Sequence, residues 1–184
     1  ATLAYNFLNS SNTHQARILF DSLNETNEYR KEIEKQITSI AIENSNQEHF
    51  IVASGDFHEG VVGIVASRLV HHYKLPAIVF SDKGDVLKGS GRSLGDVNIY
   101  ELISKCENLL EGFGGHKLAC GLSIKKENLD EFIKQINHHT SLLPKEYFYL
   151  DEFILGELPL SECDFELIEI LKSFEPYGEA NPKP

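Results

Sequence analysis

The middle of the chain alternates between short apolar runs and segments whose apolar residues recur every three or four positions. Four runs have the length and composition of strands, and they cover residues 50–53, 77–80, 86–91 and 120–124. Three segments with helical periodicity lie between or after them, at residues 61–73, 98–110 and 128–138. Strands that alternate with helices predict an α/β fold, with a mixed β-sheet flanked by helices.

Two helices are expected before this central part. Asn12 or Thr13 can cap a short helix that runs through Leu23. A longer helix, over residues 25–44, has a narrow apolar stripe on an otherwise charged surface. This pattern suits a connector between domains, and it suits an ordinary peripheral helix equally well.

The chain changes character after Pro144. The aromatic and apolar run over 147–155 predicts a strand, and Ser161 can cap a helix that runs through Phe174. The last residues, 175–184, have the composition of a connecting loop. Because the chain also contains no methionine, we expect it to be a fragment of a longer protein.

The net charge of −11 argues at first sight against a nucleic-acid partner. Residues 51–126, however, hold 9 Lys and Arg against 8 Asp and Glu, whereas the flanks hold 8 basic against 20 acidic residues. The acidity therefore belongs to the flanks, and a local phosphate site stays open.

The three cysteines lie far apart in the sequence and form no CxxC pair. An odd, scattered set indicates reduced thiols in a cytoplasmic protein rather than a disulfide framework or a zinc site. No apolar run approaches the roughly 20 residues that span a bilayer, and no secretory signal pattern opens the chain. We therefore expect a cytoplasmic location and no membrane partner.

Three glycine-containing segments are candidates for chemistry, and the first is HEGVVGIVASR at 58–68. It places Gly60 and Gly63 at the start of the helix expected over 61–73. Glycines here permit either close packing of the helix on the sheet or the approach of a phosphate to backbone N–H groups. His58, just before the helix, is either a ligand contact or an ordinary loop histidine.

The second segment is KGSGRS at 88–93. The glycines around Ser90, which include Gly91, leave the backbone bare, and the guanidinium of Arg92 can hold phosphate oxygens through two N–H groups. Ser90 and Ser93 add hydroxyl donors. This combination favours an anion site over a flexible polar turn with a surface arginine.

The third segment is GFGGHKLACG at 112–121. Gly114 and Gly115 can adopt backbone angles closed to other residues, which would place His116 and adjacent N–H groups around an anion. His116 could donate to a phosphate or act as an acid near neutral pH. The alternative is a glycine-rich hinge with a solvent-exposed histidine. We expect Arg92 and His116 to converge on one anion site, although they lie 24 positions apart.

The sequence contains no paired-aspartate metal motif, no P-loop and no Ser-His-Asp order. The neighbouring histidines at 71–72 and 138–139 fall near the C-termini of expected helices, where an imidazole suits the helix dipole. We therefore expect no metal site in this chain.

In order and spacing, the three segments resemble the DHH-associated domain of the RecJ exonucleases. The matching stretches are HEGVVGIVASRL (58–69), LKGSGRS (87–93) and FGGHKLACGLSI (113–124). The resemblance implies three parts: a helical connector from a missing catalytic domain at 1–45, the DHH-associated substrate-binding domain at 46–142, and the start of an oligonucleotide-binding fold at 143–184.

The resemblance also implies an activity, namely a 5′-to-3′ exonuclease on single-stranded DNA that acts in recombination and repair. In that family manganese or magnesium is held by an N-terminal domain with an Asp-His-His motif, which is absent from this sequence. The fragment alone is therefore expected to hold no metal and not to cut DNA. Single-stranded DNA is the implied partner, and a single-strand-binding protein or a helicase is a candidate protein partner of the full-length enzyme.

The residues that the resemblance carries over as contacts to substrate phosphates are Ser90, Gly91, Arg92, Ser93, Gly114, Gly115 and His116. His116 is also a candidate for assisting the reaction. His58 and Arg68 match the opening motif, and His58 is a candidate substrate contact, but the resemblance assigns neither a definite role. Lys117 and Cys120 depart from the small or apolar residues usual in the third motif, which hardly affects the chemistry.

Other functions stay open. A phosphodiesterase for short oligonucleotides or cyclic dinucleotides would belong to the same superfamily and share the glycine-glycine-histidine motif. A non-catalytic module like the C-terminal domain of alanyl-tRNA synthetases would bind structured RNA without a metal. An interaction domain with no nucleic-acid role would leave the concentration of glycine, serine, arginine and histidine in two loops unexplained.

Overall fold

The computed structural model describes residues 2–45, 48–149, 156–178 and 181. The chain divides into two compact units, residues 1–150 and 151–184. The first unit carries the sheet and every candidate site residue. In the second unit the described residues form a 3-10 helix (Leu160–Glu162) and the helix α6 (Phe165–Ser173).

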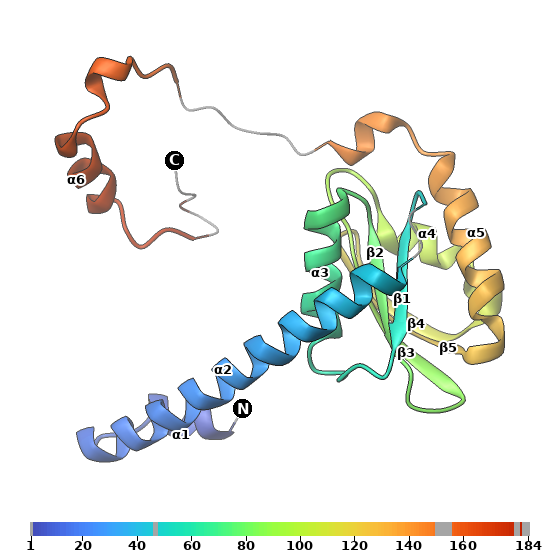
Figure 1. Ribbon diagram of the computed structural model, residues 1–184, viewed down its shortest axis with the longest axis horizontal. Coiled ribbons are helices and arrows are strands. Elements are labelled where there is room, and N and C mark those ends of the chain that lie inside the picture. The colour runs from blue at the N-terminus through green and yellow to red at the C-terminus, as the bar shows by residue number, and fades with distance from the viewer. Residues whose placement is uncertain (1, 46–47, 150–155, 179–180, 182–184) are drawn as a thin grey trace. The chain divides into compact units, whose positions relative to one another are not determined.

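A five-stranded mixed sheet forms the centre of the first unit within the described residues (Figure 1). Its strands are β1 (Ile51–Gly55), β2 (Ala77–Ser81), β3 (Val86–Arg92), β4 (Leu110–His116) and β5 (Ala119–Lys125). The spatial order is β1-β2-β3-β5-β4, in which β1 and β2 are parallel and the other neighbours are antiparallel. This arrangement confirms the α/β fold with a mixed sheet that the sequence predicts.

Helices cover the two faces of the sheet from opposite sides (Figure 1). One face packs against α3 (Val62–Tyr73) and the long helix α2 (Thr13–Asn44), and the other packs against α4 (Ile99–Ser104) and α5 (Leu129–Ser141). Each face has its own cluster of buried apolar side chains. Because residues alternate along a strand, neighbouring strand residues join different clusters.

Strand β3 shows this alternation and explains the glycines of the KGSGRS segment. Leu87 is buried in the cluster under α4 and α5, and Gly89 and Gly91 face the same way. A Cβ on Gly89 would lie 2.5 Å from the ring of Phe80, and one on Gly91 would lie 2.7 Å from Ile99. Both glycines are therefore required by packing, and the segment is a strand rather than a flexible turn.

Residues 13–44 form one continuous helix, so the prediction of two helices is wrong. No glycine or proline interrupts the stretch, and the Thr26 hydroxyl donates to the carbonyl of Ser22 (2.8 Å) inside the helix. The predicted cap is confirmed, because the Asn12 side chain accepts from the backbone N–H of His14 (2.9 Å) and Gln15 (3.2 Å). A short helix that the sequence does not predict, α1 (Thr2–Leu8), precedes it.

Three further expectations need correction. The helix expected through Leu110 ends at Ser104, and a 3-10 helix (Glu107–Leu109) leads into the unpredicted strand β4. The first two residues of the expected strand 147–155 belong instead to a 3-10 helix (Lys145–Phe148), and 150–155 lie outside the described residues. The cap of α6 is Asp164, whose carboxylate accepts from the Leu167 N–H (2.9 Å). Ser161 lies in the preceding 3-10 helix, because α6 begins only at Phe165 and Asp164 is the residue next to its first turn.

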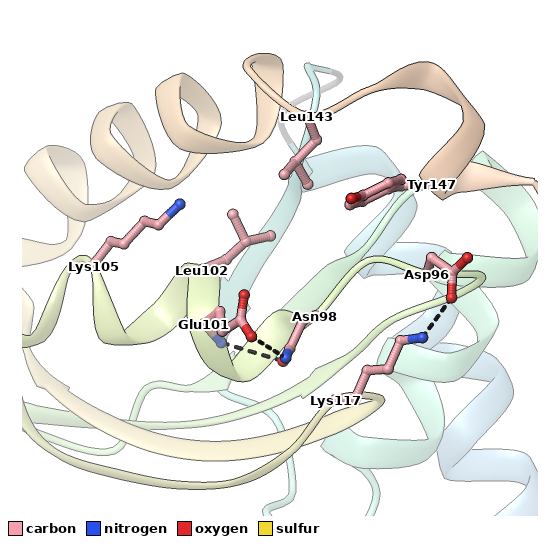
Figure 2. Close-up of a pocket in the computed structure, with 8 residues that line it drawn as sticks. All are labelled: Asp96, Asn98, Glu101, Leu102, Lys105, Lys117, Leu143 and Tyr147. Carbon is pink, nitrogen blue, oxygen red and sulfur yellow. Dashed lines mark hydrogen bonds and ion pairs between the residues drawn. The ribbon is translucent and has the colours of Figure 1, made fainter.

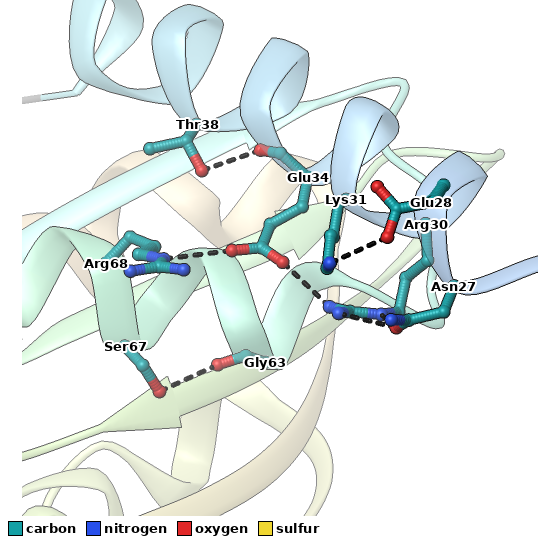
Figure 3. Close-up of polar contacts among 9 residues, drawn as sticks. All are labelled: Asn27, Glu28, Arg30, Lys31, Glu34, Thr38, Gly63, Ser67 and Arg68. Carbon is teal, nitrogen blue, oxygen red and sulfur yellow. Dashed lines mark hydrogen bonds and ion pairs between the residues drawn. The ribbon is translucent and has the colours of Figure 1, made fainter. Parts of the chain in front are cut away.

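Helix α2 is held on α3 by a buried carboxylate (Figure 3). Glu34 accepts from Arg30 one turn earlier (2.7 Å) and from Arg68 of α3 (2.9 Å). Ile37 and Ala41, further along α2, are buried in the same apolar cluster as α3. None of the helices in the described ranges is long and apolar enough to cross a membrane.

Candidate nucleic-acid interface

Ser90 and Arg92 project from β3 toward the first turn of α3. Arg92 donates from Nη1 to the Ser90 hydroxyl oxygen (3.0 Å) and to the carbonyl of Gly91 (2.7 Å). Its Nη2 atom lies 2.9 Å from the position that a Cβ on Gly63 would occupy. Both side chains are half-buried, and the Nε and Nη2 groups have no acceptor among the described residues. The guanidinium is therefore held in place while part of its donor edge stays available to an anion.

The strand register places His116 on the same face as Arg92. Arg92 pairs with Ala119 of β5, and Ala119 pairs in turn with His116 of β4. Residues directly opposite each other on neighbouring strands point to the same side of a sheet. Two strand spacings separate the Arg92 and His116 backbones by roughly 10 Å, so their side chains can reach one phosphate or two adjacent ones.

The cross-strand row next to that of Arg92, Ala119 and His116 consists of small residues. Ser90 pairs with Gly121, and Gly121 pairs with Gly114. A Cβ on Gly114 would meet no atom within 4 Å, and one on Gly121 would meet only the Gly114 carbonyl oxygen at 4.0 Å. Packing inside the domain therefore does not require these two glycines. Strand glycines without a packing reason are typical of places where a ligand approaches the backbone closely.

Gly115 has a different, purely structural reason to be glycine. Its φ is +154°, and a Cβ there would lie 2.2 Å from the carbonyl oxygen of Ala119. Any larger residue would push β4 away from β5, because the obstacle is backbone. Gly115 thus secures the strand pairing that brings His116 into line with Arg92.

The two candidate histidines are exposed and each has one ring nitrogen engaged locally. Nδ1 of His116 accepts from the N–H of Leu118 (3.4 Å), and Nδ1 of His58 accepts from the N–H of Gly60 (3.0 Å). In both rings Nε2 has no partner among the described residues. His116 lies on the strand row with Arg92, whereas His58 lies in the loop before α3.

Ser93 and Arg68 make contacts that serve the fold. The Ser93 hydroxyl donates to the carbonyl of Val97 (2.8 Å), and its N–H donates to that of Leu118 (3.0 Å). Arg68 binds Glu34 of α2 through Nε, on the side of α3 that faces α2 (Figure 3). The structure therefore groups Ser90, Arg92 and His116 on one face and leaves these two residues with internal partners.

A separate cavity of about 340 Å³ lies between α4, the β4–β5 turn and the segment after α5 (Figure 2). Its lining residues are Asp96, Asn98, Glu101, Leu102, Lys105, Lys117, Leu143 and Tyr147. Lys117 and Asp96 form an ion pair across it (2.6 Å). No sequence pattern indicates this cavity, because its residues come from three separate segments, and it contains none of the candidate phosphate contacts.

The described residues contain no group of three or more His, Cys, Asp and Glu side chains that could hold a metal ion. This part of the chain therefore does not fit a catalytic metal centre. Burial, the main cause, raises the pKa of Cys106 to about 11 and also raises that of Cys120, so both thiols stay protonated near neutral pH.

Comparison with known proteins places this arrangement in a family. The model of the DHHA1 domain matches residues 46–141. The chain belongs to the DHHA1 domain family. The match begins just before β1 and ends with α5, so all the candidate phosphate contacts lie inside this DHHA1 domain, while α1 and α2 precede it.

Relatives of this DHHA1 domain confirm the resemblance to RecJ. The single-stranded-DNA-specific exonuclease RecJ of Bacillus subtilis is 31% identical over 191 residues, which cover 98% of this chain and 24% of that protein. The crystal structure of Thermus thermophilus RecJ with Mg²⁺ matches with a TM-score of 0.85 and 26% identity, over 100% of this chain and 29% of that one. The same protein with Mn²⁺ matches with a TM-score of 0.80 and 27% identity, over 95% of this chain and 26% of that one. The chain thus spans about a quarter of the length of these relatives.

Proposed function

We propose that this DHHA1 domain holds the backbone phosphates of single-stranded DNA as the substrate-binding portion of a RecJ-type 5′-to-3′ exonuclease in recombination and repair. The observation that carries the proposal is the alignment of Arg92 with His116 through Ala119, beside the small row of Ser90, Gly121 and Gly114. The names of its relatives supply the substrate, since RecJ of Bacillus subtilis is specific for single-stranded DNA.

The chemistry of the aligned groups suits a phosphodiester. The free donor groups of Arg92 can form charge-assisted hydrogen bonds to phosphate oxygens. Ser90 accepts from Arg92, which leaves its own hydroxyl proton for a second oxygen. His116 can donate from Nε2 when that nitrogen carries a proton. Gly114 and Gly121 leave room for the sugar–phosphate backbone to lie close to the sheet.

Hydrolysis in the full-length protein would need a divalent metal, as the Mg²⁺ and Mn²⁺ structures of Thermus thermophilus RecJ suggest. The described residues contain no group of three or more His, Cys, Asp and Glu side chains that could bind such an ion. We therefore propose that this chain binds and orients the strand and does not cut it alone. A cytoplasmic location, and partnership of the full-length protein with a single-strand-binding protein or a helicase, stay predictions.

The test is the binding of a 5′-labelled single-stranded oligonucleotide to the chain at low salt. Removing one charge-assisted hydrogen bond costs about 1.5–3 kcal/mol, so Arg92→Ala should weaken binding roughly 10-fold to 100-fold. It should also flatten the dependence of log affinity on log salt by roughly 0.7 for each phosphate that the arginine no longer neutralises. His116→Ala should weaken binding by a smaller factor, because the exposed imidazole offers one free ring nitrogen whereas Arg92 offers several free N–H groups.

Lys126→Ala is the matched control. It removes one positive charge from the 3-10 helix after β5, at the far end of the sheet from Arg92, where Lys126 pairs with Asp82 (2.5 Å). The affinity of the Lys126→Ala variant for the oligonucleotide should stay close to that of the unsubstituted chain. Binding that is indifferent to Arg92→Ala and His116→Ala would refute the site. Stronger competition by a cyclic dinucleotide or by structured RNA than by single-stranded DNA would refute the proposed substrate.

A further inference from the structure

Gly63 lies in the first turn of α3. Its closest neighbours are the side chains of Arg92 and Ser90, two of the proposed phosphate contacts. A Cβ at this position would lie 2.9 Å from Nη2 of Arg92 and 3.0 Å from the hydroxyl oxygen of Ser90. The carbon at the centre of the guanidinium, Cζ, would be 3.6 Å away. Real Cβ atoms essentially never approach another heavy atom closer than 3.0 Å, so a side chain at position 63 would displace the guanidinium.

The guanidinium is confined on its other side as well. Nη1 of Arg92 is fixed by the Gly91 carbonyl (2.7 Å) and the Ser90 hydroxyl (3.0 Å). It therefore occupies a narrow space between its own strand and the first turn of α3. A shift large enough to make room for a new Cβ would disturb these hydrogen bonds. It would also turn the Nε and Nη2 groups of Arg92 away from the proposed phosphate position.

The fold itself does not require glycine at this position. Gly63 is a helical residue of α3, and its φ lies outside the left-handed region. The neighbours that a Cβ would meet are the ends of two side chains and not the backbone of the sheet, so α3 could keep its place with alanine at this position. Alanine is also the better helix former. Neither helix packing nor backbone conformation thus accounts for glycine here, whereas the place of Arg92 does.

We propose that Gly63 is a positioning residue for substrate binding, because its missing side chain provides the space in which the Arg92 guanidinium faces the phosphate. This inference rests on the proposed function. It differs from both roles that the sequence leaves open for Gly63, since the group that lies against the glycine is the side chain of Arg92 from β3.

The experiment compares Gly63→Ala with Ser67→Ala, its control one turn further along α3. Ser67 donates its hydroxyl to the Gly63 carbonyl (3.2 Å) and, like Gly63, is replaced by a better helix former (Figure 3). Gly63→Ala should weaken oligonucleotide binding about 10-fold, as expected for a misplaced charge-assisted donor, and should flatten the salt dependence by roughly 0.7. Its melting temperature should be unchanged or higher, by up to about 3 °C. Ser67→Ala should bind like the unsubstituted chain.

A double-mutant cycle with Arg92→Ala separates positioning from a general effect on the fold. In the Arg92→Ala background, Gly63→Ala should cause no further loss of affinity, because the group that it displaces is gone. Three results would overturn the inference: unchanged binding by Gly63→Ala, an equal loss in both backgrounds, or a melting temperature lowered by more than about 3 °C. In each case a loss of affinity in Arg92→Ala alone would leave the proposed function standing. Unchanged binding by Arg92→Ala would refute the proposed function as well.

Discussion

Two ion pairs of equal length in α2 should differ several-fold in their effect on stability, because only one of them contains a buried carboxylate. Arg30 and Glu34 are 2.7 Å apart, as are Lys31 and Glu28 (Figure 3). The side chain of Glu34 is 8% exposed and that of Glu28 is 59% exposed. Glu34 also binds Arg68 of α3 at 2.9 Å, whereas Glu28 has only its neighbour on the same helix among the described residues.

The magnitudes follow from these surroundings. Breaking a fully buried ion pair costs about 3–5 kcal/mol, but the partners of Glu34 are themselves 36% and 62% exposed and regain water when it is removed. We therefore expect Glu34→Ala to cost about 2 kcal/mol, between the buried and the surface limits. Glu28→Ala should cost less than about 0.5 kcal/mol, as exposed helical pairs do.

The assay is urea unfolding of both variants, combined with amide hydrogen exchange. Because Glu34 joins α2 to α3, its loss should speed exchange in α2 more than in the sheet. A coupling energy of about 1 kcal/mol between Glu34→Ala and Arg68→Ala would show that the ion pair between the helices carries part of the effect. Equal costs for Glu34→Ala and Glu28→Ala, or no coupling to Arg68, would refute the reasoning that burial decides the strength of these pairs.

Two further predictions concern packing and cysteine reactivity. Gly89→Ala should lower the free energy of unfolding by about 1–3 kcal/mol, because a Cβ would lie 2.5 Å from the ring of Phe80. Gly114→Ala, whose Cβ meets open space, should cost less than about 1 kcal/mol in the same urea titration. A thiol-alkylating reagent at pH 8 should modify exposed Cys163 well before buried Cys106, whose raised pKa of about 11 keeps the thiol protonated. Mass spectrometry of partly alkylated chain would show the order, and early modification of Cys106 would contradict the buried environment.

The pattern of apolar residues was enough to predict most of the central fold. The runs 50–53 and 77–80 correspond to β1 and β2, and their signal is strong because both faces of the sheet are covered there. The pattern was insufficient for β4, an edge strand whose GFGGH residues are mostly exposed and carry almost no hydrophobic signal. It also placed a break in α2 where the chain has neither glycine nor proline.

The candidate site, like the fold, was predictable from the sequence only in part. By itself, the sequence determined which residue types are present, namely an arginine, two serines and a histidine among glycines, and the family resemblance that the comparisons confirm. Only the tertiary structure decided which of them share a face. Arg92 and His116 align because β5 lies between β3 and β4 in the sheet, and a shift of one residue in that register would turn one of them to the opposite face. The close approach of Gly63 to Arg92 likewise joins a helix and a strand that are not neighbours in sequence, so no local pattern could have indicated it.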